Sequence, residues 1–125
     1  MGIFKGDLQI LLYTKETEFV ACREFYQVVL GQEPYYTWDE SISDRGAKFR
    51  AGRGTISVLC QDHQGNPGPV NLNLEAVDVD KEFSRLNAMN NLNHINVPKT
   101  TSYGTRFFTI TDPIGNRINI YHSDH

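Results

Sequence analysis

The chain has 125 residues, 39% hydrophobic and 22% charged, which suits one globular domain with its own core. Its 12 basic and 15 acidic residues give a formal net charge of −3 without a cluster of either sign. This balance argues against nucleic acid and anionic membranes as partners. The apolar runs are too short to span a bilayer, and the first residues lack the pattern of a signal peptide. Cys22 and Cys60 are therefore expected to be reduced and packed, in a cytoplasmic protein.

The first half of the chain predicts a strand, a helix and three more strands. Residues 7–14 form a β-type run, and the spacing turns helical over residues 18–30, between Thr17 as N-cap and Gly31 as C-cap. The expected buried stripe of this helix is Phe19, Cys22, Phe25, Tyr26 and Val29. Three short strands are expected at residues 33–38, 47–50 and 55–60. A polar loop at 39–45 and a glycine-rich turn at 51–54 separate them.

The second half repeats this order after a linker rich in glycine and proline at residues 62–69. A strand is expected at 70–77, and a helix at 79–91 has Asp78 as N-cap. Strands are then expected at 95–98, 105–111 and 116–122, with a turn at 112–115 between the last two. Asp112, Gly115 and Asn116 are interpreted as structural residues of that turn.

The repeated order indicates an internal duplication of pattern rather than of letters. The chain is predicted to be a single α+β domain, residues 1–125, built of two βαβββ modules. Module 1 covers about residues 5–61, the linker about 62–69, and module 2 about 70–123. Each module alone leaves one sheet face open, so the two are expected to pack together.

Three segments resemble motifs of the vicinal oxygen chelate superfamily, which includes glyoxalases, bleomycin resistance proteins and dioxygenases. Residues 23–31 (REFYQVVLG) resemble the end of its first helix, and residues 74–80 (LEAVDVD) resemble the entry to its second helix. Residues 112–120 (DPIGNRINI) resemble its closing hairpin. The resemblance covers nearly the whole chain and implies a curved mixed sheet around a cleft, with the helices outside.

The resemblance also implies positions for metal ligands, which are commonly His or Glu on inward-facing strand residues. These positions fall on Gln9, Asn71 and Asn119, and near Ser57 or Leu59. Amides are poor ligands for a catalytic divalent ion. No metal and no cofactor are therefore expected.

Strand alternation predicts which side chains face the cleft. The expected ligand-binding residues are Gln9, Tyr13, Trp38, Ser57, Asn71, Asn73, Glu75, Phe107, Thr109, Arg117, Asn119 and Tyr121. Glu75 is the only inward carboxylate and the one candidate for catalysis, although Arg117 on the same face could keep it ionised. The alternative is an ordinary wet sheet face. Of the four histidines, His63, His94 and His125 are expected in solvated positions, and His122 is expected to point away from the cleft.

These observations favour metal-independent binding or sequestration of a small polar organic molecule, similar to bleomycin-resistance-type proteins, over catalysis. Two alternatives remain: a metal-dependent glyoxalase- or dioxygenase-like enzyme with a relocated metal site, and a small-molecule-sensing accessory module. A homodimer is expected, because the family pairs chains and because short modules expose sheet edges. Tyr35, Tyr36 and Trp38 are candidates for the contact, and the 62–69 linker for a hinge between exchanged modules.

Overall fold

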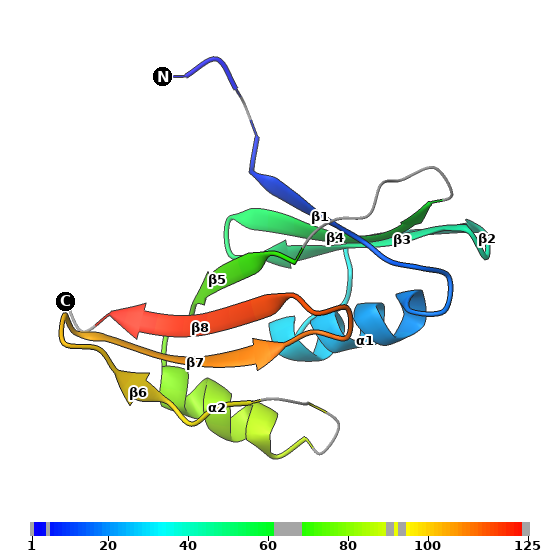
Figure 1. Ribbon diagram of the computed structural model, residues 1–125. Helices are drawn as coiled ribbons and strands as arrows, with labels where there is room; N and C mark the ends of the chain where they lie inside the picture. Colours follow the sequence, from blue (N-terminus) through cyan, green and yellow to red (C-terminus); the bar gives the residue numbers. More distant parts are fainter. Residues whose placement is uncertain (1, 5, 62–68, 90–91, 93–94, 124–125) are drawn as a thin grey trace. The chain divides into compact units, whose positions relative to one another are not determined.

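The structure is a computed structural model that describes every residue except 1, 5, 62–68, 90–91, 93–94 and 124–125 (Figure 1). The chain divides into two compact units, Met1–Pro67 and Gly68–His125. Most of the 62–69 linker and three of the four histidines, His63, His94 and His125, lie outside the described residues.

The first unit contains one helix and a four-stranded mixed sheet. Its elements are β1 (Gln9–Tyr13), α1 (Phe19–Leu30), β2 (Tyr36–Ser41), β3 (Asp44–Ala51) and β4 (Gly54–Gln61). The strand order is β1-β4-β3-β2, in which β1 runs parallel to β4 and the other pairs are antiparallel.

The second unit repeats this arrangement. Its elements are β5 (Asn71–Glu75), α2 (Val79–Asn87), β6 (Lys99–Thr100), β7 (Thr105–Thr111) and β8 (Arg117–Ser123). The strand order is β5-β8-β7-β6, and again the first strand of the unit runs parallel to the last. The predicted α+β class with two βαβββ modules is therefore confirmed.

In each unit one sheet face packs against the helix of that unit. Helix α1 contacts β3 and β4, and its buried residues are the five that the spacing predicts: Phe19, Cys22, Phe25, Tyr26 and Val29. Helix α2 contacts β7 and β8, where the rings of Phe83 and Phe108 meet edge to face with centroids 5.5 Å apart. The opposite face of each sheet, which carries the alternate residues of every strand, is called its open face below.

The turn before β8 is held by a buried carboxylate, as predicted. Asp112 Oδ1 accepts the backbone N–H groups of Ile114 and Asn116 at 3.0 and 2.7 Å, and Oδ2 accepts the Asn116 side chain at 2.9 Å. The side-chain Oδ1 of Asn116 then accepts the backbone N–H of Val70 at 2.9 Å. Asp112 and Asn116 thus join the start of β8 to the start of β5. Gly115 has a φ of 94°, which a glycine adopts without strain.

Some predicted boundaries are wrong. Residues 39–45 are not a loop, because β2 continues to Ser41 and only a tight turn precedes β3. Its residues are mostly exposed, and the apolar alternation that signals a strand is therefore missing. Residues 95–98 are not a strand, since β6 begins at Lys99 after Pro98, which has no N–H to donate.

The helices also differ from expectation at their ends. The N-cap of α1 is Glu18 rather than Thr17, and Glu18 Oε1 accepts the N–H of Lys15 at 2.9 Å. Gly31 is the C-cap with a φ of 68°, as predicted. Helix α2 ends at Asn87, before the predicted residue 91, while its N-cap Asp78 is confirmed by a 3.2 Å bond from Lys81 N.

Candidate functional site

The open face of the second sheet carries all the site residues predicted for that half. They are Asn71, Asn73, Glu75, Phe107, Thr109, Arg117, Asn119 and Tyr121. The register places Asn73 beside Asn119, and Asn119 beside Thr109, across β5, β8 and β7. Their chain neighbours Leu72, Ile118 and Ile110 are buried on the opposite face. The side-chain alternation read from the sequence is therefore confirmed, whereas a role in binding stays a prediction.

A row of polar side chains crosses the middle of this open face. Thr109 Oγ1 donates to Asn119 Oδ1 at 2.9 Å, and Asn119 Nδ2 donates to Asn73 Oδ1 at 2.8 Å. These bonds orient the amide of Asn119 and place the amide nitrogen of the exposed Asn73 at the end of the row. Two N–H donors in a fixed position can bind a carbonyl or hydroxyl oxygen of a ligand.

Glu75 lies with the aromatic residues at one end of this face, and Arg117 lies at the other end. Phe107 and Tyr121 are cross-strand partners, and Glu75 is beside Tyr121 on β5. Arg117 lies four residues before Tyr121 on β8, about 13 Å away at the rise of a strand. No ion pair joins Glu75 to Arg117 within the part of the chain that the structure describes. Within the described residues, Glu75 therefore lacks the ion pair with Arg117 that the sequence suggested.

The open face of the first sheet carries Gln9, Tyr13, Trp38 and Ser57. Ser57 Oγ donates to Gln9 Oε1 at 2.7 Å. Ser57 has no exposed surface, so a ligand on this face would contact Gln9 rather than the serine hydroxyl. The bond joins β1 to β4, so its counterpart in the second sheet is the Asn119–Asn73 bond between β8 and β5, as the repeated strand order implies.

Trp38 is held by residues that the sequence analysis did not single out. Its Nε1 donates to Asp44 Oδ1 at 3.0 Å, and its ring lies over Gly46, its partner on β3. Tyr36 is next to it with ring centroids 5.9 Å apart. The sequence contained one indication of this contact, which is Gly46 itself, because a glycine inside a strand often marks a close approach by another group.

The positions that correspond to metal ligands do not fit a divalent ion. Gln9 Oε1 and Asn119 Oδ1 already accept hydrogen bonds, from Ser57 and Thr109. All of these groups are neutral, whereas such ions are usually held by imidazole, thiolate or carboxylate. Across the described residues, no group of three or more His, Cys, Asp and Glu side chains is placed to hold a metal.

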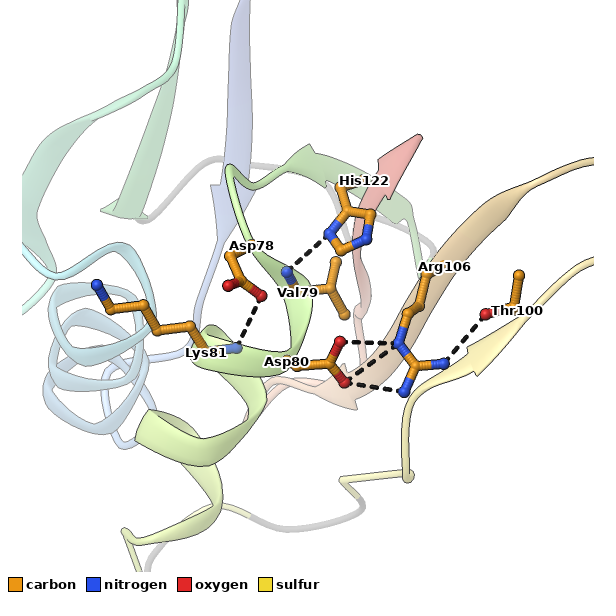
Figure 2. Close-up of polar contacts among 7 residues, drawn as sticks. All are labelled: Asp78, Val79, Asp80, Lys81, Thr100, Arg106 and His122. Carbon is orange, nitrogen blue, oxygen red and sulfur yellow. Dashed lines mark hydrogen bonds and ion pairs between the residues drawn. The ribbon is translucent and has the colours of Figure 1, made fainter. Parts of the chain in front are cut away.

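A separate polar cluster surrounds the start of α2, on the helix side of the second sheet (Figure 2). His122 points away from the open face, as predicted, and its Nδ1 accepts the backbone N–H of Val79 at 2.9 Å. Arg106 donates to both oxygens of Asp80, at 2.8 and 2.9 Å, and to Thr100 at 3.0 Å. The side-chain hydrogen bond from Arg106 lowers the pKa of the Asp80 carboxyl below its ordinary value of 3.8. These contacts fasten the helix to β7 and β8 and belong to the scaffold.

Cys22 and Cys60 are both buried thiols, which confirms the prediction that they are packed. Among the helices that the structure describes, none is long and apolar enough to cross a membrane.

Comparison with solved structures agrees with the architecture. No family model and no curated protein matches the sequence. Many solved structures match the fold, however, and those named for the glyoxalase/bleomycin resistance protein/dioxygenase superfamily are among them. The chain therefore has the vicinal oxygen chelate fold.

Three similar structures carry different functional names. TnmS3, an antibiotic binding protein from Streptomyces sp. CB03234, matches with a TM-score of 0.75 and 19% identity over 99% of this chain and 100% of that one. A glyoxalase/bleomycin resistance protein from Catenulispora acidiphila matches with a TM-score of 0.70 and 19% identity, covering 94% and 98%. Lactoylglutathione lyase from Agrobacterium tumefaciens matches with a TM-score of 0.71 and 20% identity, covering 92% and 91%. At these identities the likeness shows the fold alone.

Proposed function

We propose that this protein binds and sequesters a small polar organic molecule without a metal or cofactor, as a cytoplasmic protein. The observation that carries the proposal is the pair of neutral hydrogen-bonded sets, Gln9–Ser57 and Thr109–Asn119–Asn73. Gln9 and Asn119 in these sets fall on positions where the family resemblance implies His or Glu metal ligands, and Ser57 falls near another. An antibiotic binding protein among the similar structures supports the same reading.

The binding residues proposed are those predicted on the two open faces, except that the buried Ser57 acts only by orienting Gln9. The set is Gln9, Tyr13, Trp38, Ser57, Asn71, Asn73, Glu75, Phe107, Thr109, Arg117, Asn119 and Tyr121. Amide groups would form directional hydrogen bonds, and the aromatic rings would supply apolar area and stacking. We propose two modules of a single domain, over about residues 5–61 and 70–123, and each carries some of these residues. Glu75 would act as a hydrogen-bond acceptor.

A thermal-shift screen of drug-sized polar compounds tests sequestration directly. A compound at 100 times its dissociation constant stabilises the native state by about 2.7 kcal/mol, which raises the melting temperature of a domain of this size by several degrees. The screen should yield at least one compound whose effect saturates and which is recovered unchanged. Turnover of a hit would contradict sequestration.

The main alternative function is that of a metal-dependent lyase or oxidoreductase. It is considered because a lactoylglutathione lyase is among the similar structures. It requires tight, stoichiometric zinc, nickel, manganese or iron. We expect elemental analysis of the purified protein to find none, and added metal to leave the melting temperature unchanged. Stoichiometric metal that a chelator removes, with loss of stability, would favour the enzyme. Pull-down of a stoichiometric partner protein would favour the accessory module.

We also propose that the protein is a homodimer. Strand β2 ends the first sheet, and an unpaired strand edge is readily covered by a second copy. Tyr35 and Tyr36, 47% and 55% exposed, lie at this edge beside Trp38. Light scattering should give twice the mass of one chain at micromolar concentration. A single-chain mass that does not rise with concentration would exclude the dimer.

A further inference from the structure

Trp38 is fixed within its own chain with its ring flat on the open face of the first sheet. A Cβ atom on Gly46 would overlap Cη2, Cζ2 and Cζ3 of the Trp38 ring. A point so close to all three carbons must lie beneath the six-membered ring and not beside its edge. One face of the indole therefore covers Gly46. The Nε1 bond to Asp44 prevents the ring from turning about its own axis.

The other face of the indole is directed away from the sheet, and Trp38 is only half-buried. Tyr36 extends the aromatic surface along β2, on the same face of the sheet. A flat ring that is held in place before binding loses little conformational entropy when a second ring stacks on it. The arrangement is therefore a preformed stacking surface rather than a mobile side chain.

Two cations lie beside this surface. Lys48 is the cross-strand partner of Tyr36, and its Nζ lies 5.8 Å from the centroid of that ring. Arg50 stacks on Tyr35 at 4.4 Å and reaches Asp7 at 3.4 Å. In the described part of the chain Lys48 forms no ion pair, so its charge is left for a ligand. Asp44, a carboxylate on the same face of β3, already accepts the indole N–H.

We propose that the Trp38 surface selects a planar aromatic ligand that carries an anionic group, with Lys48 as the residue that determines charge preference. Lys48 and Gly46 lie two residues apart on β3, so the cation is anchored about 7 Å from the point beneath the indole. In a bicyclic aromatic acid, the carboxylate and the ring system are separated by a distance of this order. The inference rests on the proposed function and adds the class of ligand to it.

The chain contains one tryptophan, so a single indole N–H resonance in a ¹⁵N-labelled sample reports on this site. The probes are naphthalene-2-carboxylate and naphthalen-2-ylmethylammonium, which share a ring and differ in charge. The carboxylate should shift the indole resonance saturably and bind at least tenfold more tightly than the amine. Equal affinity for the two probes, or no shift with the carboxylate, would overturn the proposal.

Variants separate the ring from the charge. Lys48→Gln should remove most of the preference for the carboxylate, while Lys81→Gln on the exposed surface of α2 should retain it. Gly46→Ala should weaken the binding of both probes, because the methyl group of the alanine displaces the indole. If Gly46→Ala does not fold, Lys48→Gln still decides the matter: an unchanged preference refutes the role of Lys48.

Failure here is distinct from failure of sequestration. A compound that raises the melting temperature but leaves the indole resonance in place would keep the proposed function and overturn the stacking surface. Pairing of two chains through the β2 edge uses backbone groups and leaves the outer ring face open. Two results together would instead assign the ring to the chain–chain contact: loss of the dimer in Trp38→Ala, and no effect of either probe on the indole resonance of the wild-type protein.

Discussion

His122 Nδ1 accepts the backbone N–H of Val79 at 2.9 Å, so a side chain of the last strand caps the first turn of α2. The first N–H groups of a helix have no partner within the helix, and this one is partly buried. Asp78 satisfies the N–H of Lys81 in the same turn. Two side chains from different elements therefore share the capping of one helix.

His122→Ala should reduce the free energy of unfolding by about 1 kcal/mol, the usual cost of losing a helix cap. Urea unfolding followed by circular dichroism measures the change. Ser123→Ala, at the exposed next position of β8, is the control and should have almost no effect. Wild-type stability in His122→Ala would mean that the Val79 N–H finds another acceptor.

Arg106→Gln should change the way in which stability depends on acid pH. Arg106 lowers the pKa of Asp80 below 3.8, so the pair stabilises the native state above that value. The contribution disappears as the pH falls through the lowered pKa and Asp80 becomes protonated. The difference in unfolding free energy between wild type and Arg106→Gln should therefore be largest near neutral pH and shrink below about pH 4.

A matched variant isolates the ion pair from general loss of charge. Arg53→Gln removes an exposed arginine from the turn between β3 and β4, and its effect should not follow the titration of Asp80. If both variants show the same pH profile, the effect comes from net charge and not from the contact with Asp80.

Leu72→Ala should reduce the free energy of unfolding much more than Asn73→Ala, although the two residues are adjacent. Leu72 is 4% exposed on the helix side of β5, so its truncation leaves a cavity and should cost about 2–4 kcal/mol. Asn73 is exposed on the open face and its loss should cost less than about 1 kcal/mol. Urea unfolding measures both. Asn73→Ala should nevertheless weaken the binding of any compound that the thermal-shift screen finds. Unchanged affinity would remove Asn73 from the proposed site.

Asp112→Ala should be among the most destabilising polar substitutions in the chain. It removes the acceptor of three hydrogen bonds from a residue that is 4% exposed, and we expect a loss of about 2–4 kcal/mol. Pro113→Ala, at an exposed position of the same turn, should cost much less. A small effect of Asp112→Ala in thermal unfolding would show that the turn forms without its carboxylate.

Local pattern was sufficient to predict the elements with the clearest spacing. The stripe of α1 is readable because each apolar residue recurs on one helical face, and the faces of β5 and β8 follow from strict alternation. The closing hairpin was predicted because Asp, Pro, Gly and Asn have their own turn preferences. The repeated order of strands and helices followed from these elements, and with the motif resemblance it indicated the fold.

Two contacts depend on the tertiary structure alone: the packing of Trp38 over Gly46, and the hydrogen bond by which His122 caps α2. Gly46 lies beneath Trp38 because β2 and β3 pair in one particular register. The sequence predicted a strand at residues 33–38, but the exposed, polar residues of β2 revealed neither where the strand ends nor its register. His122 reaches Val79 across a separation of 43 residues, which no local periodicity encodes. A sequence determines directly what depends on near neighbours and on the burial of a face. Contacts between distant segments depend on how strands align, and that alignment is fixed by packing of the whole module.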